Sequence, residues 1–592
     1  MYSRTYIHSF VRIYSVAYII VATKMSINKE KEGGGSDAGG GSSSPSSGRL
    51  NSGHSMVFKM QLAMGSIPLW LMAIVGGQAS SIYSLVFNCN VGILGAILVV
   101  IAIVDTVFNP LAGYFQDKEW LSRCFPSASW GRRAPWYITH VPIAILCTFL
   151  VFVPPQSESG GNAKFETYCW FAFVSILAKW VTTVCWIANG AASDEIFPAQ
   201  DERVQLYGMR VVTIWVAALV GVVAVNIVVG DADNAPDRCC GAEFTENLPS
   251  SCKTIVNETT GSEMYVIESS DGVNDMSTTT TMAIVCVAFS LVGLFAISPM
   301  RMAKQPADLD KVERMWQSLQ AFLKWRPFLY LFVVTCLDAL CGQILTVIAP
   351  FFMAYVIALD RDEYSRVLIL TTVLGMIAHL FAAAVCVWVF GTESERSKTK
   401  SINPRVSAMV ACVFFAVSQP VLIALTDLGY EDDDKTKKRG EVFYIVASFV
   451  ASRFTLAPLR TFTTAARGWL VDLDVQKSQG GRREALVNGI LLISINLSGI
   501  LAMLVLTSLS WAGIDTSKCW GENQSKGGVM YVKFLFMAVI PLLMLFCAVF
   551  IWLFPIHGDV LKNLENKQAR TYVKTPTSTP GRSKVHPTPG GD

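Results

Sequence analysis

The stretch that decides the fold runs from Val91 to Pro155 and contains two apolar runs joined by a polar turn. Its first run reads VGILGAILVVIAIVDTVFNPLAGYF, and its second lies within WGRRAPWYITHVPIAILCTFLVFVPP. Each run is long enough to cross a bilayer as a helix. The first run holds one carboxylate, Asp105, among aliphatic neighbours. Because a charge at that depth is costly, it indicates a functional cavity rather than a position facing lipid.

The turn between the two runs fixes the orientation of this hairpin. It is rich in basic residues, and basic loops mark the cytoplasmic side of a membrane protein. These residues are Lys118, Arg123, Arg132 and Arg133. We therefore place the turn in the cytoplasm, and we predict that the hairpin carries both an ion site and a gating loop.

The composition of the whole chain excludes an ordinary soluble enzyme. Its 592 residues are 16% charged, whereas globular chains carry roughly 25% charge. Apolar runs of about 20 residues, the length of a spanning helix, recur along most of the chain. We predict an all-α membrane protein with twelve spans, near residues 60–84, 91–116, 134–154, 167–190, 207–230, 279–299, 328–358, 365–390, 404–427, 441–465, 485–508 and 529–554.

The predicted spans form two six-helix halves, residues 56–299 and 328–557, joined by a charged cytoplasmic connector at 300–327. Two such halves indicate the parallel-repeat architecture of secondary transporters.

Both ends of the chain differ in composition from the spans. Residues 1–55 form an N-terminal extension, rich in glycine and serine after residue 25, and residues 558–592 form a cytoplasmic tail. We expect the Gly/Ser-rich segment and the tail to be disordered. Residues 1–24 lack acidic side chains and hold one short apolar run. They are either a targeting segment or a non-functional extension ahead of Met25.

The predicted outer loops carry signs of an oxidising compartment. Two glycosylation acceptors, Asn257 and Asn523, lie in these loops. The loops also hold four cysteines, Cys239, Cys240, Cys252 and Cys519. A bridge from Cys239 or Cys240 to Cys519 would join the two halves, whereas a Cys239–Cys252 bridge would stay within one loop. The residues themselves leave both pairings open.

Four polar side chains fall inside other predicted spans, namely Lys179, Asp338, His379 and Arg453. We predict that the charged ones line a translocation path and pair across helices. The alternative is that Lys179 and Arg453 extend toward the membrane surface or form purely structural pairs. We expect His379 to be a hydrogen-bonded core residue.

Two cytoplasmic turns resemble each other, GAASDEIFPAQDERVQLYGMR at 190–210 and ARGWLVDLDVQKSQGGRREALVNG at 466–489. Each places acidic residues at the end of a span and an arginine–glutamate pairing farther along. We predict that such charges hold the two halves together on the cytoplasmic side, although topology and helix capping are alternative roles. The predicted gate consists of Asp117, Arg132, Arg133, Asp194, Arg203, Asp472, Arg482 and Glu484.

Three sets of residues resemble motifs of a known family. The loop motif of the major facilitator superfamily resembles four residues here, Asp105, Pro110, Gly113 and Asp117, which are spaced five, three and four positions apart. The segment from Trp130 to Pro155 resembles the third-span signature of its glycoside–pentoside–hexuronide:cation symporter branch. The branch motif between spans ten and eleven is matched by Gly480, Arg482, Glu484 and Ala485. The likeness covers about residues 59–557 and implies transport by alternating access.

Within this branch the chain resembles the sodium-dependent lysophosphatidylcholine symporters. VVGDADNAPDRCC at 228–240 and WAGIDTSKC at 511–519 are similar to two outer loops of those proteins. In those relatives a disulfide joins the two loops, so the resemblance implies the bridge to Cys519. It also implies an amphipathic, lipid-like substrate such as a lysophospholipid, with a sugar or glycoside as the second alternative.

The chain departs from the family at the ion site. The family offers sodium two carboxylates four residues apart, and these positions hold Asp105 and Asn109 here. A basic residue of the eleventh span corresponds to Asn496. Hard cations prefer oxygen ligands, so the loss of a carboxylate weakens a sodium site. We predict coupling to Na⁺ or H⁺ at Asp105, Asn109 and Asn496, and an uncoupled carrier is the alternative.

The substrate path departs from the family as well. The sugar-binding aspartates of melibiose permease correspond to about Trp70 and Trp186, and aromatic replacements suit a more apolar substrate. Lys179 is predicted to attract an anionic group such as a phosphate. The predicted path therefore contains Lys179, Trp70, Trp186, Asp338 and Arg453.

Two rival classes of function remain. No P-loop, metal-ligand cluster or acyl-transfer motif stands out, so we expect no enzyme, catalytic residue, resident metal or cofactor. A receptor that keeps the fold without transporting is the other class, and the neutral Asn109 and Asn496 favour it. We expect a monomer in the plasma membrane or an endomembrane of a eukaryote, surrounded by lipids and without a nucleic-acid partner.

Overall fold

The computed structural model describes most of the membrane region and leaves out both ends of the chain. The described residues are 54–77, 91–154, 165–197, 200–230, 252–256, 263–267, 276–302, 315–357, 361–390, 404–427, 434–477, 483–514 and 525–557, with a few single positions between them. All of them belong to one compact unit that begins at His54.

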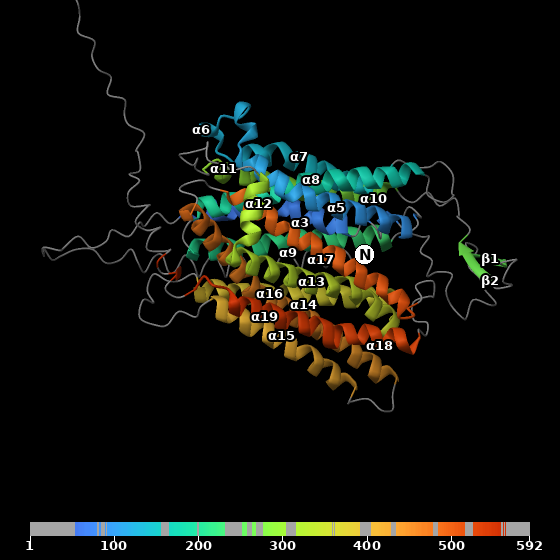
Figure 1. The fold of residues 1–592 in the computed structure, drawn as a ribbon. Coiled ribbons are helices and arrows are strands. Elements are labelled where there is room, and N and C mark those ends of the chain that lie inside the picture. The colour runs from blue at the N-terminus through green and yellow to red at the C-terminus, as the bar shows by residue number, and fades with distance from the viewer. Residues whose placement is uncertain are drawn as a thin grey trace, which may run out of the picture. The chain divides into compact units, whose positions relative to one another are not determined.

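Twelve segments among these residues are helical, long and apolar enough to cross a membrane, which confirms the predicted number of spans. The N-terminal half contains α2 (Met56–Met64), α3 (Ile67–Gly77), α5 (Val91–Asp117), α7 (Ala134–Phe152), α8 (Phe165–Ile196), α9 (Gln200–Gly230), α10 (Met276–Leu291), η4 (Val292–Ala296) and α11 (Ile297–Met300). The C-terminal half contains α13 (Arg326–Phe351), η6 (Phe352–Val356), α14 (Arg361–Phe390), α15 (Pro404–Asp427), α16 (Asp434–Lys477), α17 (Glu484–Trp511), α18 (Lys526–Phe534), η7 (Leu535–Val539) and α19 (Ile540–Leu553). Figure 1 shows the long helices side by side with roughly parallel axes.

The helices have the inside-out polarity expected of membrane spans. On α5, the aliphatic side chains of Val100, Ile103 and Val107 are exposed, while Asp105 and Asn109 are buried. A row of exposed aliphatic side chains would be unfavourable in water but is compatible with lipid. The charged side chains of the span therefore face the protein interior, as the sequence predicts.

Three short elements lie between the spans. The turn after α5 contains η1 (Trp120–Arg123) and α6 (Ser127–Trp130), and the connector contains α12 (Met315–Lys324). The guanidinium of Arg483 lies over the ring of Phe322 at 4.9 Å and donates to the Ser318 hydroxyl at 3.2 Å. These contacts join α12 to the beginning of α17.

The long outer loop contains the only strands among the described residues. β1 (Cys252–Val256) and β2 (Glu263–Ile267) pair antiparallel, with Cys252 opposite Ile267. This ribbon adds to the all-α fold class, which holds for the spanning region.

Two spans extend farther, on the side of the basic loops, than the sequence predicts. α8 continues to Ile196, and α16 continues to Lys477. Their last turns are buried, including Trp469, Leu470 and Val471 on α16, and packing of this kind stabilises helix beyond the apolar run. Asp194 and Asp472, which the sequence assigns to turns, therefore lie on helices. The helical backbone sets the direction in which each side chain points.

The two halves have separate cores that touch at one end. One buried cluster belongs to the C-terminal half, and Tyr114 of α5 packs against it. A second cluster belongs to the N-terminal half and includes Ala485 of α17. A third cluster, around Tyr83 and Phe171, contains residues of the N-terminal half alone. The shared packing lies at the end of the helices that carries the basic loops, which is called the inner end below.

Candidate functional site

The inner ends of the two halves meet where α5 crosses α17. A Cβ atom added at Gly113 would lie 2.5 Å from the carbonyl oxygen of Ala485, and one added at Gly489 would overlap the carbonyl oxygen of Asn109. Glycine at both positions lets the two backbones approach closely. The halves are therefore in direct backbone contact at this crossing.

Asp117, at the end of α5, caps the first turn of α17. Its carboxylate accepts hydrogen bonds from the backbone N–H of Leu486 at 2.9 Å and of Ala485 at 3.4 Å. Free N–H groups at a helix N-terminus and the helix dipole both favour a negative charge there. A carboxylate of one half therefore completes a helix of the other half.

Two buried arginines bind the carboxylates around this cap. Arg133 donates to Asp117 at 2.8 Å and to Glu195 at 2.5 Å, and Glu484 lies 3.8 Å away. Arg132 lies 3.4 Å from Glu195 and 3.8 Å from Glu484. Burial alone would lower the pKa of Arg133, but the carboxylates of Glu195, Asp117 and Glu484 outweigh it and raise that pKa further. The guanidinium therefore stays charged at any pH used in an assay.

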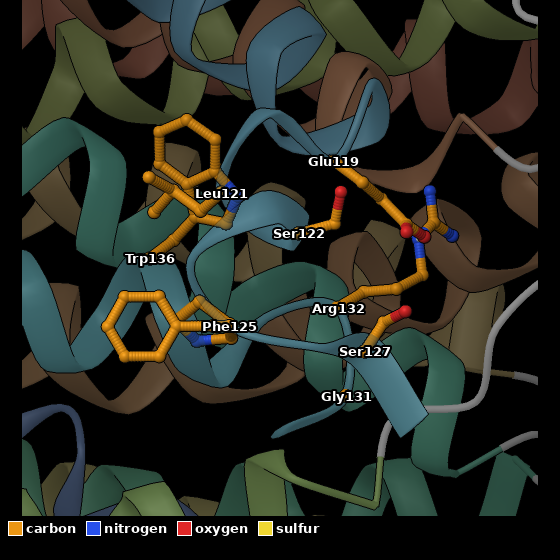
Figure 2. A pocket seen from close by; sticks show the side chains of 9 residues that line it. Glu119, Leu121, Ser122, Phe125, Ser127, Gly131, Arg132 and Trp136 are labelled. Carbon is orange, nitrogen blue, oxygen red and sulfur yellow. The ribbon is translucent and has the colours of Figure 1, made fainter. Parts of the chain in front are cut away.

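Glu119 is added to this network by an unusual backbone turn. Its φ of 51° places a non-glycine residue in the left-handed region, which is costly and uncommon. The turn directs the carboxylate back toward Arg132, whose Nε lies 3.0 Å away. Figure 2 shows the two side chains facing each other at the edge of a small pocket that Phe125 and Trp136 also line.

A second group of contacts between the halves surrounds Asp194. Arg467 lies 3.2 Å from its carboxylate, and the amide of Asn488 donates to it at 3.3 Å. Arg203 lies 3.1 Å from Asp472 and also donates to the carbonyl oxygen of Phe197 at 2.7 Å. Each of these carboxylates is thus paired with a group from the opposite half.

The structure brings together seven of the eight predicted gate residues, Asp117, Arg132, Arg133, Asp194, Arg203, Asp472 and Glu484. Arg482 lies outside the described residues. Its neighbour Arg483 pairs instead with Asp474 at 2.5 Å, within the C-terminal half. Glu119, Arg467, Arg483 and Asn488 also take part in these contacts, and the sequence did not predict them.

Farther from the inner end, Asp105 lies in a small polar site. The Thr183 hydroxyl lies 3.0 Å from Oδ1 of Asp105 and 3.1 Å from Oδ1 of Asn109. The ammonium of Lys179 lies 3.7 Å from Oδ2 of Asp105. All of these residues belong to α5 and α8.

This site has an unsatisfied group. Thr183 has one proton to donate, and Nδ2 of Asn109 is buried without a partner among the described residues. Turning the Asn109 amide over satisfies every donor, because Thr183 then donates to Asp105 and accepts from Nδ2. The amide oxygen of Asn109 then takes the buried position that has no partner among the described residues.

The polar site faces the boundary between the halves. Lys179, Thr183 and Trp186 follow the i, i+4, i+7 spacing of one helix face. The next member of this face, Gly190, packs against Asn488 of α17. Trp186 also meets Trp70 of α3 edge to face, with ring centroids 5.5 Å apart. The two tryptophans are therefore direct neighbours.

Asn496 lies at about the depth of Lys179. Gly489 of α17 lies against Asn109 of α5 and Ile187 of α8, so these three residues are at the same depth. The chain direction of α17 is opposite to that of α5 and α8. Asn496 follows Gly489 by seven residues, or about 10 Å, and Lys179 precedes Ile187 by eight, or about 12 Å. A seven-residue step returns to the same helix face. Nδ2 of Asn496 is buried and without a partner in the described part of the chain.

The C-terminal half has an ion pair of its own. Asp338 lies 2.8 Å from Arg460, so this predicted path residue is tightly paired on its own side. Arg453 lies over the ring of Trp215 at 5.6 Å. His379 is buried and hydrogen-bonded, and it accepts from Trp215 of the other half at 3.1 Å.

Residues 57–558 match the family described as MFS/sugar transport protein, which covers both halves and every span. The chain belongs to this family. As a member of the major facilitator superfamily, it is an integral multi-pass membrane protein of a transporter family, and the superfamily part of the resemblance is confirmed. No curated protein matches the sequence.

Two solved structures of another transporter share the fold. A bacterial homologue of the iron transporter ferroportin, in an outward-facing state, matches with a TM-score of 0.52 at 13% identity, over 84% of this chain and 99% of that chain. The same homologue soaked with iron gives 0.50 at 12% identity, over 84% and 98%. The proton:xylose symporter bound to 6-bromo-6-deoxy-D-glucose gives 0.47 at 12% identity, over 86% and 98%. At such identities the likeness concerns the fold alone.

Several predictions for the transporter's outer loops concern residues that the structure does not describe. Cys239, Cys240 and Cys519 lie outside the described residues, as do Asn257 and Asn523. Cys252 begins β1. The disulfide and the glycosylation sites therefore stay predictions.

Proposed function

We propose that this protein is an alternating-access symporter that moves an amphipathic, lipid-like solute such as a lysophospholipid together with a cation. The observation that supports it best is the position of Asp105. Its carboxylate lies beside Thr183 and Asn109. Asp105 is farther from the inner end than Asn109 and Gly113, where α17 contacts α5. A buried carboxylate beside such a boundary is suited to bind an ion from one side at a time.

The ligands around Asp105 favour a small hard cation. The carboxylate of Asp105, the hydroxyl of Thr183 and the amide of Asn109 lie together there. Oxygen donors of these kinds bind hard cations in proteins. Na⁺ fits this set as a co-transported ion, and a proton carried by Asp105 is the alternative.

We infer the substrate class from aromatic and charged side chains of the N-terminal half. Trp70 and Trp186 pair edge to face, and Trp180 packs against Phe108 at 5.1 Å. Aromatic surfaces of this kind accommodate an acyl chain, whereas the ammonium of Lys179 attracts a phosphate. A lysophospholipid carries both groups.

Uptake of labelled lysophosphatidylcholine by cells expressing the full chain tests the proposal. We expect uptake with sodium present and little when choline replaces it, and we expect Asp105→Asn to abolish the sodium requirement together with most uptake. Uptake that follows an imposed pH gradient would assign coupling to protons. Absence of uptake under all three conditions would exclude a lysolipid substrate.

Charge reversal at Lys179 tests its role toward the substrate. We expect Lys179→Glu to abolish uptake, because a second carboxylate would face both Asp105 and the substrate phosphate. Normal uptake by this variant, at normal surface expression, would contradict the role.

A sugar or glycoside symporter is the second candidate, and the description of the matching family favours it. Labelled glycosides in the same cells would distinguish the two, because a glycoside site would transport them and leave lysophosphatidylcholine outside. Ligand binding without any flux would instead indicate a receptor.

A further inference from the structure

We propose that Lys179 is a built-in counter-ion of Asp105, which the co-transported cation displaces so that the freed ammonium can bind the anionic group of the substrate. The inference rests on the proposed function and deepens it. It explains how one half of the protein can couple a cation to an anionic solute without a direct contact between the two.

The geometry of the pair shows which partner is free to move. The side chain of Asp105 is 5% exposed and accepts a hydrogen bond from Thr183. The side chain of Lys179 is 54% exposed, and its ammonium is 3.7 Å from the Asp105 carboxylate, which is a long distance for an ion pair. The ion pair of the other half, Asp338 and Arg460, is closer, with Nε of Arg460 at 2.8 Å from the carboxylate. A lysine is a point charge on a flexible stem, so it can leave a carboxylate easily.

Charge balance couples the two binding events. A carboxylate in this environment needs one positive charge beside it, which Lys179 supplies when no cation is bound. A bound Na⁺ supplies the same charge and leaves the ammonium without a partner. A substrate anion then restores the balance, so each ligand strengthens the binding of the other.

Asn496 offers a second donor for the same anion. It lies at about the depth of Lys179, on the face of α17 that Gly489 presents to α5 and α8, and its Nδ2 is buried without a partner among the described residues. A phosphate accepts hydrogen bonds from an ammonium and also from an amide N–H. An anion bound by Lys179 and Asn496 would contact both halves, as alternating access requires.

The test measures ligand binding by the purified full chain in detergent. Trp180 and Trp186 lie on α8 beside Lys179 and Thr183, so tryptophan fluorescence can report Na⁺ and lysophosphatidylcholine binding. For the wild type we expect Na⁺ to tighten lysophosphatidylcholine binding about tenfold. For Lys179→Gln we expect Na⁺ to bind about tenfold more tightly, because no ammonium competes, and lysophosphatidylcholine binding to become weak and independent of Na⁺.

Two further variants serve as references. Lys179→Arg keeps the charge, so Na⁺ should still tighten substrate binding. Lys526→Gln removes an exposed lysine at the start of α18 and should behave as wild type. A monoacylglycerol, which lacks the phosphate, should bind without any effect of Na⁺.

The outcomes separate this inference from the proposed function. An unchanged Na⁺ affinity in Lys179→Gln would overturn the counter-ion role even if sodium-driven uptake is intact. Failure of the wild type to bind lysophosphatidylcholine would overturn the proposed substrate, while the comparison of Na⁺ affinities would still decide the role of Lys179. Absence of Na⁺ binding in both proteins would overturn sodium coupling and the inference together.

Discussion

Two groups of charged side chains lie along α5 and α8, one at the inner ends of these helices and one around Asp105, and they are paired in different ways. At the inner ends, Arg132 and Arg133 share the carboxylates of Asp117, Glu119, Glu195 and Glu484. About three turns away, the described contacts of Asp105 are the Lys179 ammonium at 3.7 Å and the Thr183 hydroxyl at 3.0 Å. The inner group is buried and crosses between the halves, whereas the other belongs to one half and leaves one polar atom of the Asn109 amide without a partner among the described residues.

We infer from this difference that the inner group holds the conformation of the protein, whereas the group around Asp105 exchanges a ligand. Burying charges is expensive, and such a network adds little to stability beyond what an apolar core would supply, but removing one member leaves an uncompensated buried charge. The inner network therefore specifies one arrangement of the halves. The loose pair at Asp105 can change partners at low cost, which is what a transported ion requires.

The largest effect is expected from Arg133, whose guanidinium is completely buried between three carboxylates. Arg133→Gln should destabilise the protein by about 3–5 kcal/mol, because Asp117 and Glu195 lose their nearest cation. The measurement is the melting temperature of the purified protein. Arg123→Gln, on the exposed part of the same loop, is the control and should melt as wild type. Equal melting of the two variants would contradict the structural role of the network.

The crossing of α5 and α17 should be next in sensitivity. Gly489→Ala places a methyl group against the carbonyl oxygen of Asn109 and 3.4 Å from Ile187, so the helices must separate. We expect a loss of about 1–3 kcal/mol, measured by melting, together with slower uptake. Gly342→Ala is the control, because a Cβ there meets no atom within 4 Å. Unchanged melting of Gly489→Ala would show that the halves are not in contact at this crossing.

A single pair between the halves should contribute less. Arg203 and Asp472 lie 3.1 Å apart and are both buried. In a double-mutant cycle of Arg203→Gln and Asp472→Asn, we expect a coupling energy of about 1–2 kcal/mol, read from melting in the same detergent. Strict additivity of the two substitutions would place the pair outside the set of contacts that hold the halves together.

The sequence was sufficient to predict the spans and most members of the inner network. Twelve apolar runs are a strong signal, and Asp117, Arg132 and Arg133 stand in one short polar turn. Glu119 could not be selected, because its role depends on a left-handed backbone turn that nothing in its neighbours specifies. Arg467 could not be paired either, because its partner Asp194 lies 273 positions away along the chain.

The polar site around Asp105 was predicted in part for a similar reason. A carboxylate inside an apolar run is visible in the sequence, and so is the lysine of α8. That the two lie within 3.7 Å of each other depends on the packing of α5 against α8, which no local pattern reports. Thr183 was missed because a threonine in a span more often bonds to its own helix backbone.

The smallest effect on stability is expected from removing the neutral Thr183 hydroxyl from the site around Asp105, because no charge is lost. Thr183→Val removes the hydroxyl near Asp105 and Asn109 but keeps the shape of the side chain and the Lys179 pair. We expect melting to change by about 1 kcal/mol or less, while sodium stimulation of uptake falls about tenfold. Thr182→Val is a matched control one residue away, because the Thr182 hydroxyl is buried without a partner in the described part of the chain. If both variants keep normal sodium stimulation, Thr183 is not a ligand; if Thr183→Val instead unfolds the protein, the site around Asp105 holds the structure together as the inner network does.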